Sequence, residues 1–311
     1  MNANTNSATT TYRAAVVRSP QGPDSIEMAD LPLVEPGPGE VRVRIAAATV
    51  NPVDLGVAGG VFHRLGLVHQ PEHVGLGWDF AGTISAAGPG AELTVGTRVA
   101  GLVDGFDRDF GPYAEELVLP AGNLAVVPDG LDLTAAATVP LNALAAAQLL
   151  DLLGDAPGEG RRLLVTGAAG AVGSYVAALA PARGWEVTGL ARVEDETFVR
   201  GLGAEFTAQA TPGWDAVADA AALQNKALAL VRDGGAFVGV QPSARPAAER
   251  GIRVDVVVAH PDGTRLSGLL ADVASGRLPA RVHAVFPLEQ AGDAHRAMAK
   301  GGVRGRIVLK P

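Results

Sequence analysis

Residues 163–180 of this 311-residue chain read LLVTGAAGAVGSYVAALA, an apolar run, three spaced glycines and an alanine-rich run. The first run is typical of a buried strand and the last of a helix, so the glycines lie in the turn between them. The spacing Ala168-x-Gly170-x-x-Gly173 matches the dinucleotide fingerprint G-x-G-x-x-G, with alanine in place of its first glycine. Gly170 would let a pyrophosphate approach the backbone, and Gly173 would let the helix pack closely on the strand.

This stretch predicts a dinucleotide site with the phosphates at the N-terminus of the helix, where free N–H groups and the helix dipole favour an anion. An ordinary tight turn between a strand and a helix is the alternative interpretation, because glycine spacing alone is a weak signal. The residues expected to contact the cofactor here are Gly167, Ala168, Ala169, Gly170, Ala171, Val172 and Gly173.

The second strand of this region, within WEVTGLAR at residues 185–192, indicates which dinucleotide binds. An NAD site usually has Asp or Glu at the end of this strand, where the carboxylate binds the ribose hydroxyls. Ala191 and Arg192 occupy that end here; a small residue leaves room for a 2′-phosphate, which a guanidinium can bind through two hydrogen bonds. We therefore expect NADPH, with Arg192 at its 2′-phosphate. A solvated surface arginine is the alternative, and the acidic residues 194–196 would repel a phosphate if they faced it.

The rest of the chain shows two patterns that meet near residue 128. Before it, short strands are separated by turns rich in glycine and proline, which predicts a small all-β, barrel-type unit. From residue 162 onward strands alternate with helices, which predicts an α/β fold with an open, doubly wound parallel sheet. A helical stretch rich in Ala and Leu covers residues 133–153, and residues 263–311 read as helix, strand, helix and strand. The strands expected before residue 128 are 12–18, 40–50, 79–88, 97–103, 114–120 and 124–128.

Composition excludes several classes of function. Hydrophobic residues make up 48% of the chain and charged residues 19%, so a sizeable core can be buried. The sequence has no cysteine, which excludes disulfides, thiolate zinc sites, iron–sulfur clusters and a cysteine nucleophile. The formal net charge of −8 argues against a nucleic-acid partner and against polybasic membrane binding. We find no apolar run long enough to span a membrane and no signal peptide in residues 1–11, so we expect a soluble, cytoplasmic protein.

Other catalytic motifs are missing from the sequence. It contains neither a G-x-S-x-G nucleophile elbow nor a G-x-x-x-x-G-K-[ST] phosphate loop. Neither Tyr113 nor Tyr175 is followed four residues later by a lysine, so the Tyr-x-x-x-Lys pair of short-chain dehydrogenases is missing too. A functional prediction therefore depends on the dinucleotide turn and on the motifs around it.

Taken together, these motifs resemble the zinc-free quinone oxidoreductase branch of the medium-chain dehydrogenase/reductase superfamily. The resemblance covers residues 12–311, and it is specific because nine short landmarks follow one another in the family's order. They are 51–54 (NPVD), 77–83 (GWDFAGT), 95–99 (VGTRV), 111–115 (GPYAE), 168–173 (AAGAVG), 202–205 (LGAE), 234–238 (GGAFV), 286–288 (FPL) with 294–296 (AHR), and 305–309 (GRIVL).

The resemblance implies a GroES-like catalytic domain of residues 1–128 and 264–311, with a Rossmann dinucleotide-binding domain of residues 129–263 between them. It also implies a substrate cleft where the two domains meet, and homodimers formed along the Rossmann sheets. The nicotinamide end of the cofactor would meet the segments that follow the later strands of the sheet. The residues expected there are Gly239, Val240, Gln241, Val258 and His260.

The same comparison argues against a metal site. The zinc-dependent branch has a cysteine about where Asn51 lies and a His-Glu pair where Trp78 and Asp79 lie. Zinc prefers thiolate and imidazole ligands, and neither is available at these positions. The spacing of the nearby histidines fits no standard metal site, so we expect no metal. These histidines are His63, His69 and His73.

Without a metal, hydride transfer depends on the cofactor, while the protein positions the reactants and excludes water. Asn51 is the expected cleft residue near the nicotinamide ribose or the substrate, because its amide both donates and accepts hydrogen bonds; a simple Asn-Pro turn is the alternative. The family often has a tyrosine in the segment that follows, but here Phe62 lies near that place and residues 13–112 contain no tyrosine. A proton donor would therefore be His63, His69 or water, although His63 also fits an ordinary loop position.

The predicted function is NADPH-dependent transfer of hydride to a quinone or a similar conjugated carbonyl. One alternative is reduction of an enone or enoyl ester in a biosynthetic pathway. Another is a protein that binds NADPH with little turnover, which the missing tyrosine and the alanine at position 168 leave open. The expected partner is a small molecule, with neither nucleic acid nor membrane involved.

Overall fold

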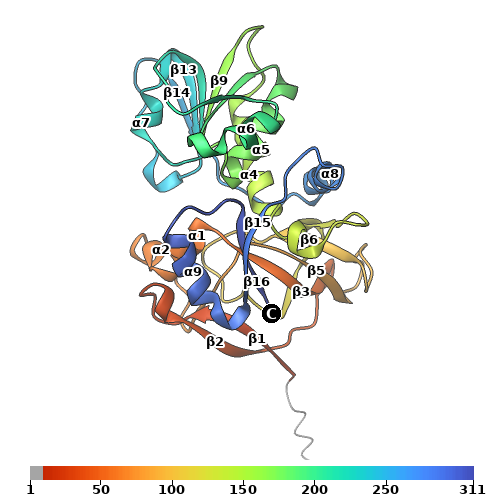
Figure 1. Ribbon diagram of the computed structural model, residues 1–311. Helices are drawn as coiled ribbons and strands as arrows, with labels where there is room; N and C mark the ends of the chain where they lie inside the picture. Colours follow the sequence, from red (N-terminus) through yellow and green to blue (C-terminus); the bar gives the residue numbers. More distant parts are fainter. Residues whose placement is uncertain (1–9) are drawn as a thin grey trace, which may run out of the picture.

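The computed structural model describes residues 10–311, which form two lobes that meet along one side (Figure 1). Within these residues, one lobe contains a six-stranded sheet, and the other contains a seven-stranded and a three-stranded sheet. The chain leaves the second lobe after β8 (Leu124–Val126) and returns to it before β15 (Val282–Pro287). This is the predicted α/β arrangement, with an all-β unit completed by the C-terminal part of the chain.

The strands of the first lobe are β9 (Arg162–Thr166), β10 (Glu186–Leu190), β11 (Glu205–Thr207), β12 (Trp214–Asp219), β13 (Val231–Gly239) and β14 (Arg253–Val256). They are parallel and lie in the order β11-β10-β9-β12-β13-β14. This is the doubly wound order, which reverses direction between β9 and β12. Ligands of such sheets bind beyond the carboxyl ends of the strands at the reversal, which is where the glycine turn begins.

Helices cover both faces of this sheet; they are α4 (Pro140–Leu153), α5 (Ala171–Leu179), α6 (Glu196–Gly201) and α7 (Asn225–Leu228). Alternate residues of a strand point to opposite faces. Leu163 and Val165 of β9 therefore pack in the core that contains α4 and α5, whereas Leu164 packs with Leu228 of α7. Because both faces are buried, the central strands appear in the sequence as continuous apolar runs.

The remaining strands are β1 (Thr11–Val17), β2 (Ile26–Pro32), β3 (Glu40–Val50), β4 (Val74–Gly75), β5 (Asp79–Ala87), β6 (Arg98–Leu102), β7 (Glu116–Pro120) and β16 (Arg306–Lys310). The larger sheet has the order β15-β16-β3-β5-β6-β8, with β7 paired to β3; the smaller has the order β2-β1-β4. Strand β16 pairs antiparallel with β3, where Ile307 lies opposite Val50. The last strand of the chain therefore lies beside the residues that lead into Asn51.

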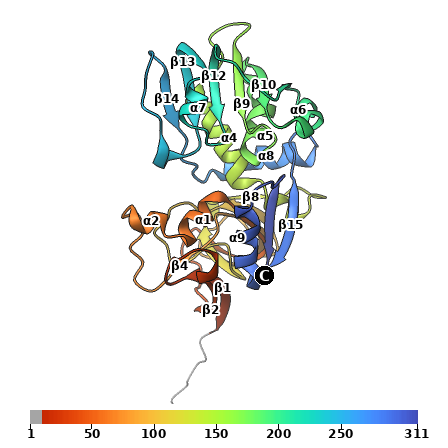
Figure 2. The ribbon, with the colours of Figure 1, turned by 60° about the vertical axis from the view of Figure 1, so that its left-hand side comes forward.

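Figure 2 shows the side of the second lobe on which β15 and α9 lie, with α8 at the junction above them. Helix α8 packs on α4 of one lobe and on β8 of the other, so it helps to join them. The remaining helices are α1 (Pro52–Ala58), α2 (Val61–Arg64), α3 (Leu133–Ala136), α8 (Gly263–Ala274) and α9 (Ala291–Ala299).

Three expectations about these elements change. Strand β2 is not among the strands expected from the sequence, because it is half exposed and its apolar alternation is weak. The helical stretch 133–153 is divided into α3 and α4 at Pro140, which has no N–H to continue a helix. By length and apolar composition the same stretch could cross a membrane, contrary to the expectation that no run does, but most of it is buried inside the protein, as in a core helix.

Candidate cofactor and substrate site

The glycine turn joins β9 to α5, and each of its three glycines has its own reason to lack a side chain. Gly167 has φ 61°, in the left-handed region that favours glycine. A Cβ on Gly173 would lie 2.2 Å from the carbonyl oxygen of Gly167, so α5 packs on the turn at backbone distance. A Cβ on Gly170 would lie 3.0 Å from the same carbonyl oxygen; Gly170 is also the N-cap of α5, where the first N–H groups of a helix have no partner within it. The turn thus has the geometry that a dinucleotide phosphate requires.

Ala168, which replaces the first glycine of the fingerprint, fits without opening the turn. It is fully buried, and its N–H donates to the carbonyl of Leu190 at 3.2 Å. Gly189 of β10 makes the room, because a Cβ there would lie 2.6 Å from the Cβ of Ala168. The methyl group that the turn gains is therefore balanced by a glycine on the neighbouring strand, a compensation that only the register of β9 and β10 reveals.

The cofactor residues predicted from the sequence lie along one edge of the parallel sheet. Thr166, the last residue of β9, pairs with Leu190 and Asp219, and Gly239 pairs with Asp219 and Val256. The carboxyl ends of five strands therefore meet, and the segments that follow four of them carry the predicted residues. These are 167–173, Arg192, Gly239, Val240, Gln241, Val258 and His260.

Asp219 organises this edge, although the sequence analysis did not select it. Its buried carboxylate accepts hydrogen bonds from the Thr166 hydroxyl at 2.6 Å and from the backbone N–H groups of Leu223 at 3.1 Å and Gln224 at 2.8 Å. Gln224 has φ 56°, a costly conformation for a residue other than glycine, so these bonds hold a strained loop. The Gln224 side chain then donates to Gln241 at 3.0 Å. A signal was available, since an acidic residue that ends an apolar strand is seldom buried without a partner.

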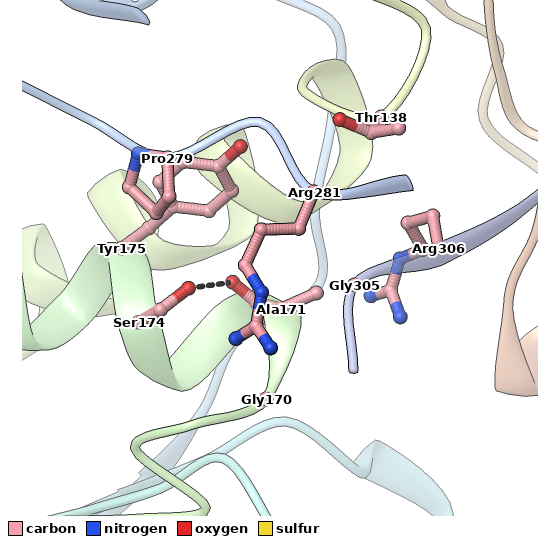
Figure 3. Close-up of a pocket in the computed structure, with 9 residues that line it drawn as sticks. All are labelled: Thr138, Gly170, Ala171, Ser174, Tyr175, Pro279, Arg281, Gly305 and Arg306. Carbon is pink, nitrogen blue, oxygen red and sulfur yellow. Dashed lines mark hydrogen bonds between the residues drawn. The ribbon is translucent and has the colours of Figure 1, made fainter. Parts of the chain in front are cut away.

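A small cavity of about 10 Å³, the size of one water, lies at the N-terminus of α5 (Figure 3). Arg306 approaches it from β16; this buried guanidinium donates to Asn142, and among the described residues its Nε has no hydrogen-bond partner. Arg281 approaches from the segment before β15 and donates to the carbonyl of Ala169 at 3.1 Å. Burial lowers the pKa of both arginines, so the surroundings favour an anion that stabilises their charge. A glycine cradle beside an unpaired buried cation fits the pyrophosphate of a nicotinamide dinucleotide.

Arg192 lies just past β10, where the sequence predicts it, with 64% of its side chain exposed and its guanidinium 3.9 Å from Glu194. Asp195 is buried and accepts a hydrogen bond from Nε of Arg304 at 2.6 Å, and Arg304 also lies 3.6 Å from Glu194. Arg304 comes from the other lobe, in the connection between α9 and β16. Two of the carboxylates that would repel a phosphate are therefore paired with guanidinium groups.

The segment after β14 is fixed by Gln148 of α4. Its Nε2 donates to the backbone carbonyl of His260 at 2.9 Å, and its Oε1 accepts from the N–H of His260 at 3.0 Å. Val258 in the same segment is 67% exposed, although the backbone on either side is held in place. An exposed apolar side chain on a fixed backbone is a suitable surface for a flat ring to cover.

Asn51 lies at the junction of the lobes, within a buried polar network. Its Nδ2 donates to Asp79 at 2.8 Å and to the hydroxyl of Thr49 at 3.1 Å, and its Oδ1 accepts from Asn142 of α4 at 3.5 Å. Asn142 accepts from Arg306, so the network reaches the cavity at α5. Burial raises the pKa of Asp79, while its hydrogen bond from Thr49 and the charge of Arg306 oppose the rise. Asn51 is only 1% exposed, so it lies beneath the surface of the junction, whereas the sequence placed it in a cleft.

Asp54 joins the start of α1 to the loop before β5. Its carboxylate caps α1 by accepting from the N–H of Asn51 at 2.8 Å, and it also accepts from the N–H of Gly77 at 3.1 Å. Burial raises the pKa of Asp54 to about 7. In the same core, the Tyr113 hydroxyl lies 3.3 Å from Nε2 of His295, whose pKa burial lowers to about 4. These groups lie in the lobe that contains the seven-stranded sheet and help to hold it together.

His63 lies on α2, and no hydrogen bond joins it to the Asn51 network within residues 10–311. Its neighbour Phe62 stacks on Phe106 with ring centres 3.9 Å apart, and Trp78 meets Phe106 edge-on at 5.4 Å. His69 is exposed and pairs with Asp107. Among the residues that the structure describes, no group of three or more His, Asp or Glu side chains is arranged to hold a metal ion.

Two family models match the chain, and together they cover more than half of it. The alcohol dehydrogenase GroES-like domain matches residues 37–129, and the zinc-binding dehydrogenase model matches residues 194–309. A solved quinone oxidoreductase from Coxiella burnetii shares the fold, with a TM-score of 0.84 at 24% identity over 97% of this chain and 100% of that one. A solved NAD-dependent alcohol dehydrogenase has a TM-score of 0.80 at 29% identity, over 96% of this chain and 99% of that one.

Curated relatives give the same result. A probable zinc-binding oxidoreductase, mitochondrial, of Arthroderma benhamiae is 30% identical over 88% of each chain, and 2-haloacrylate reductase of Burkholderia sp is 29% identical over 96% of this chain and 98% of that one. A mycocerosic acid synthase-like polyketide synthase of Mycobacterium tuberculosis is 31% identical over 94% of this chain, which spans only 15% of that synthase. The predicted family is confirmed: the chain belongs to the medium-chain dehydrogenase/reductase superfamily, as an oxidoreductase with a nicotinamide cofactor.

Proposed function

We propose that the protein transfers hydride from NADPH to a quinone or a similar conjugated carbonyl, without a metal. The observation that carries the proposal is the glycine turn at the carboxyl end of β9, where the buried Arg306 lines the same cavity as Gly170 and Arg192 follows the neighbouring strand β10. Ala191 and Arg192 follow β10, where an NAD site usually has an acidic side chain. This combination favours a dinucleotide with an additional phosphate.

Residues 1–128 and 264–311 would form the catalytic domain, and residues 129–263 the cofactor domain. Bound NADPH supplies the hydride. Asn51, held by its bond to Asp79 beneath the surface of the junction, would support the residues that position the reacting groups there. The oxyanions of a reduced quinone can take protons from water, and His63 is the candidate side chain if a proton donor within the protein is needed.

The nicotinamide end of the site would be formed by the segments after β13 and β14. Gly239, Val240 and Gln241 lead away from β13, and the bond from Gln224 to Gln241 orients the first of these segments. The second segment, which contains Val258 and His260, is fixed through its backbone by α4. Both would exclude water from one side of the ring, which is the protein's main contribution to such a reaction.

A second candidate function is reduction of an enone or enoyl ester. The similarity to 2-haloacrylate reductase, which extends over 98% of that protein, favours it. That protein is named for a conjugated acid. We therefore propose the same class of acceptor for this chain. The two candidates use the same cofactor site and differ in the acceptor.

The deciding experiment follows the loss of reduced-nicotinamide absorbance with a panel of quinones and conjugated enones, using NADPH and NADH in parallel. Turnover of quinones with NADPH preferred over NADH is the expected result. Turnover confined to an enone would transfer the protein to the second candidate. Binding of NADPH without oxidation by any acceptor would contradict both and leave a cofactor-binding protein with little turnover.

We also propose a cytoplasmic homodimer formed along the Rossmann sheets, with a small molecule as the only partner. Strand β14 is one of the two edge strands of that sheet, and among residues 10–311 no strand pairs with its outer side, so a second copy can add there. Light scattering coupled to size-exclusion chromatography should give twice the mass of the chain. A monomer at micromolar concentration would contradict the dimer.

A further inference from the structure

Arg281 lies in the connection between α8 and β15, which belongs to the catalytic lobe, yet its guanidinium reaches the glycine turn of the other lobe. Figure 3 shows its side chain extending along the first turn of α5. One hydrogen bond, 3.1 Å long, joins its Nη1 to the carbonyl of Ala169. On the other side, the guanidinium carbon lies 3.9 Å from the ring centre of Phe198 in α6. The side chain is thus held between the turn and the helix that follows β10.

The charge of Arg281 is not neutralised by a carboxylate. Among residues 10–311 no Asp or Glu forms an ion pair with it, and Asp195, whose charge acts on it, already accepts from Arg304 at 2.6 Å. The positive end of α5 adds to the same region. Cations that are gathered in a partly buried place raise the free energy of the protein unless an anion joins them.

The position of this unpaired charge corresponds to one part of a dinucleotide. In a Rossmann site the adenine ribose lies beyond the end of the second strand, here β10, and beside the glycine turn. Arg281 contacts the glycine turn through Ala169 and, through Phe198, the helix α6 that follows β10. Arg192 follows the end of β10, the strand that pairs with β9 beside the turn, and its side chain is largely exposed.

We propose that Arg281 binds the 2′-phosphate of NADPH, from the side opposite Arg192. The inference rests on the proposed use of NADPH and adds a specificity residue to it. Arg281 lies between α8 and β15, where the chain returns to the lobe with the seven-stranded sheet. That lobe would therefore contribute to the choice between NADPH and NADH. NADPH would also hold the two lobes together through a contact that NADH lacks.

The test measures binding alone, by isothermal titration calorimetry of the wild-type protein and of Arg281→Met with NADPH and NADH. Methionine keeps most of the length and the packing on Phe198 but removes the charge. The Kd for NADPH should rise about tenfold or more, as expected when a charge-assisted hydrogen bond is lost, and the Kd for NADH should change less than about threefold. The fragments 2′,5′-ADP and 5′-AMP should show the same contrast. An equal rise for both dinucleotides would overturn the proposal, because it would place Arg281 at the pyrophosphate.

Arg277→Met is the matched control. Arg277 lies four residues earlier in the same connection, is 67% exposed and pairs with Asp272, so its replacement should leave both Kd values unchanged. If Arg281→Met does not fold, Arg281→Lys keeps the charge without the two-pronged geometry, and it should weaken NADPH binding alone. If the wild-type protein prefers NADPH and the Arg281 variants keep the same preference, the role of Arg281 is refuted but the use of NADPH is not. If the wild-type protein shows no preference, both the role of Arg281 and the use of NADPH are overturned.

Discussion

At Gly173, helix α5 touches the turn that precedes it. The space for a side chain is taken by the Gly167 carbonyl, and a Cβ would also lie 3.1 Å from the Cα of Ala168. Backbone cannot move aside as a flexible side chain can, so an added methyl group would push the first turn of α5 away from the strand. The position of the phosphate-binding N–H groups depends on that distance.

Gly173→Ala should therefore lower the free energy of unfolding by about 1–3 kcal/mol, the usual cost of overpacking. It should also weaken the binding of both NADPH and NADH. Urea unfolding and dinucleotide titration measure the two effects. Gly268→Ala in the exposed middle of α8 is the control, because a Cβ there would meet nothing within 4 Å. The control should be neutral or slightly stabilising, since alanine favours a helix. Unchanged cofactor affinity in Gly173→Ala would mean that the turn does not bind phosphate.

Arg192 permits a second test at the scale of one residue. If its guanidinium binds the 2′-phosphate, Arg192→Ala should raise the KM for NADPH about tenfold and leave the KM for NADH nearly unchanged. Initial rates with the best acceptor of the panel provide the measurement. Arg200→Ala is a suitable control, because Arg200 is an exposed arginine of α6 that pairs with Glu196 and Glu205. Equal effects on the two cofactors would remove Arg192 from the phosphate site.

Among the elements, the loops that follow β12 and β13 act as a pair. Asp219 binds the strained loop after β12, and the bond from Gln224 to Gln241 transmits its position to the loop after β13. Neither loop is held by the strands themselves, because the ladder hydrogen bonds end at Asp219 and Gly239. One buried carboxylate therefore sets the shape of both loops, which would form the nicotinamide end of the proposed site.

Asp219→Asn should disturb this pair, because both carboxylate oxygens of Asp219 accept hydrogen bonds, whereas an amide has one accepting oxygen and a donor NH2 group in place of the other. The free energy of unfolding should fall by about 1–3 kcal/mol, the cost of a buried group left without a partner, and the Kd values for NADPH and NADH should rise together. Chemical unfolding and calorimetry measure these changes. Asp233→Asn, an 81% exposed partner of Arg250, should change neither. An Asp219→Asn variant with wild-type affinity would separate the two loops from the cofactor site.

In the whole molecule, the lobes are joined by polar groups that neither lobe supplies alone. Asn142 of the cofactor lobe accepts from Arg306 and donates to Asn51, both of the catalytic lobe. The catalytic lobe also contains two buried titratable groups whose pKa values move in opposite directions: Asp54 to about 7 and His295 to about 4. Their effects on stability oppose each other between about pH 4 and 6.5.

A pH series of urea unfolding tests this balance. The folded protein holds a proton on Asp54 that the unfolded chain releases, so this group stabilises the fold in acid and its contribution is lost as the pH rises toward 7. His295 is neutral in the fold, so its contribution is present above pH 6.5 and is lost as the pH falls toward 4. Asp54→Asn should therefore lose stability in acid more steeply than the wild type, by up to about 1.4 kcal/mol per pH unit, and His295→Gln less steeply. Parallel profiles for all three proteins would show that neither group titrates with the fold.

The helices and strands, and the glycine turn at the carboxyl ends of the parallel strands, could be predicted from the sequence. Each of them depends on residues that are neighbours along the chain. The apolar run at 163–166, the glycine spacing and the alanine-rich helix determine one another locally. Ala191 and Arg192 follow their strand directly, so their place at the sheet edge comes from the same local order. The weak strand β2 could not be predicted, because half of it faces solvent and its pairing with β1 supplies what its pattern lacks.

Only the tertiary structure decided which charges meet. Arg281 and Ala169 are 112 residues apart, Arg306 and Asn142 are 164 apart, and nothing local in the sequence links either pair. The tolerance of Ala168 depends in the same way on a glycine in the neighbouring strand. The spacing of apolar residues and glycines along the chain thus determines the strands, the helices and the turn. The partners of buried polar groups depend instead on how the C-terminal part of the chain packs against the lobe with the six-stranded sheet.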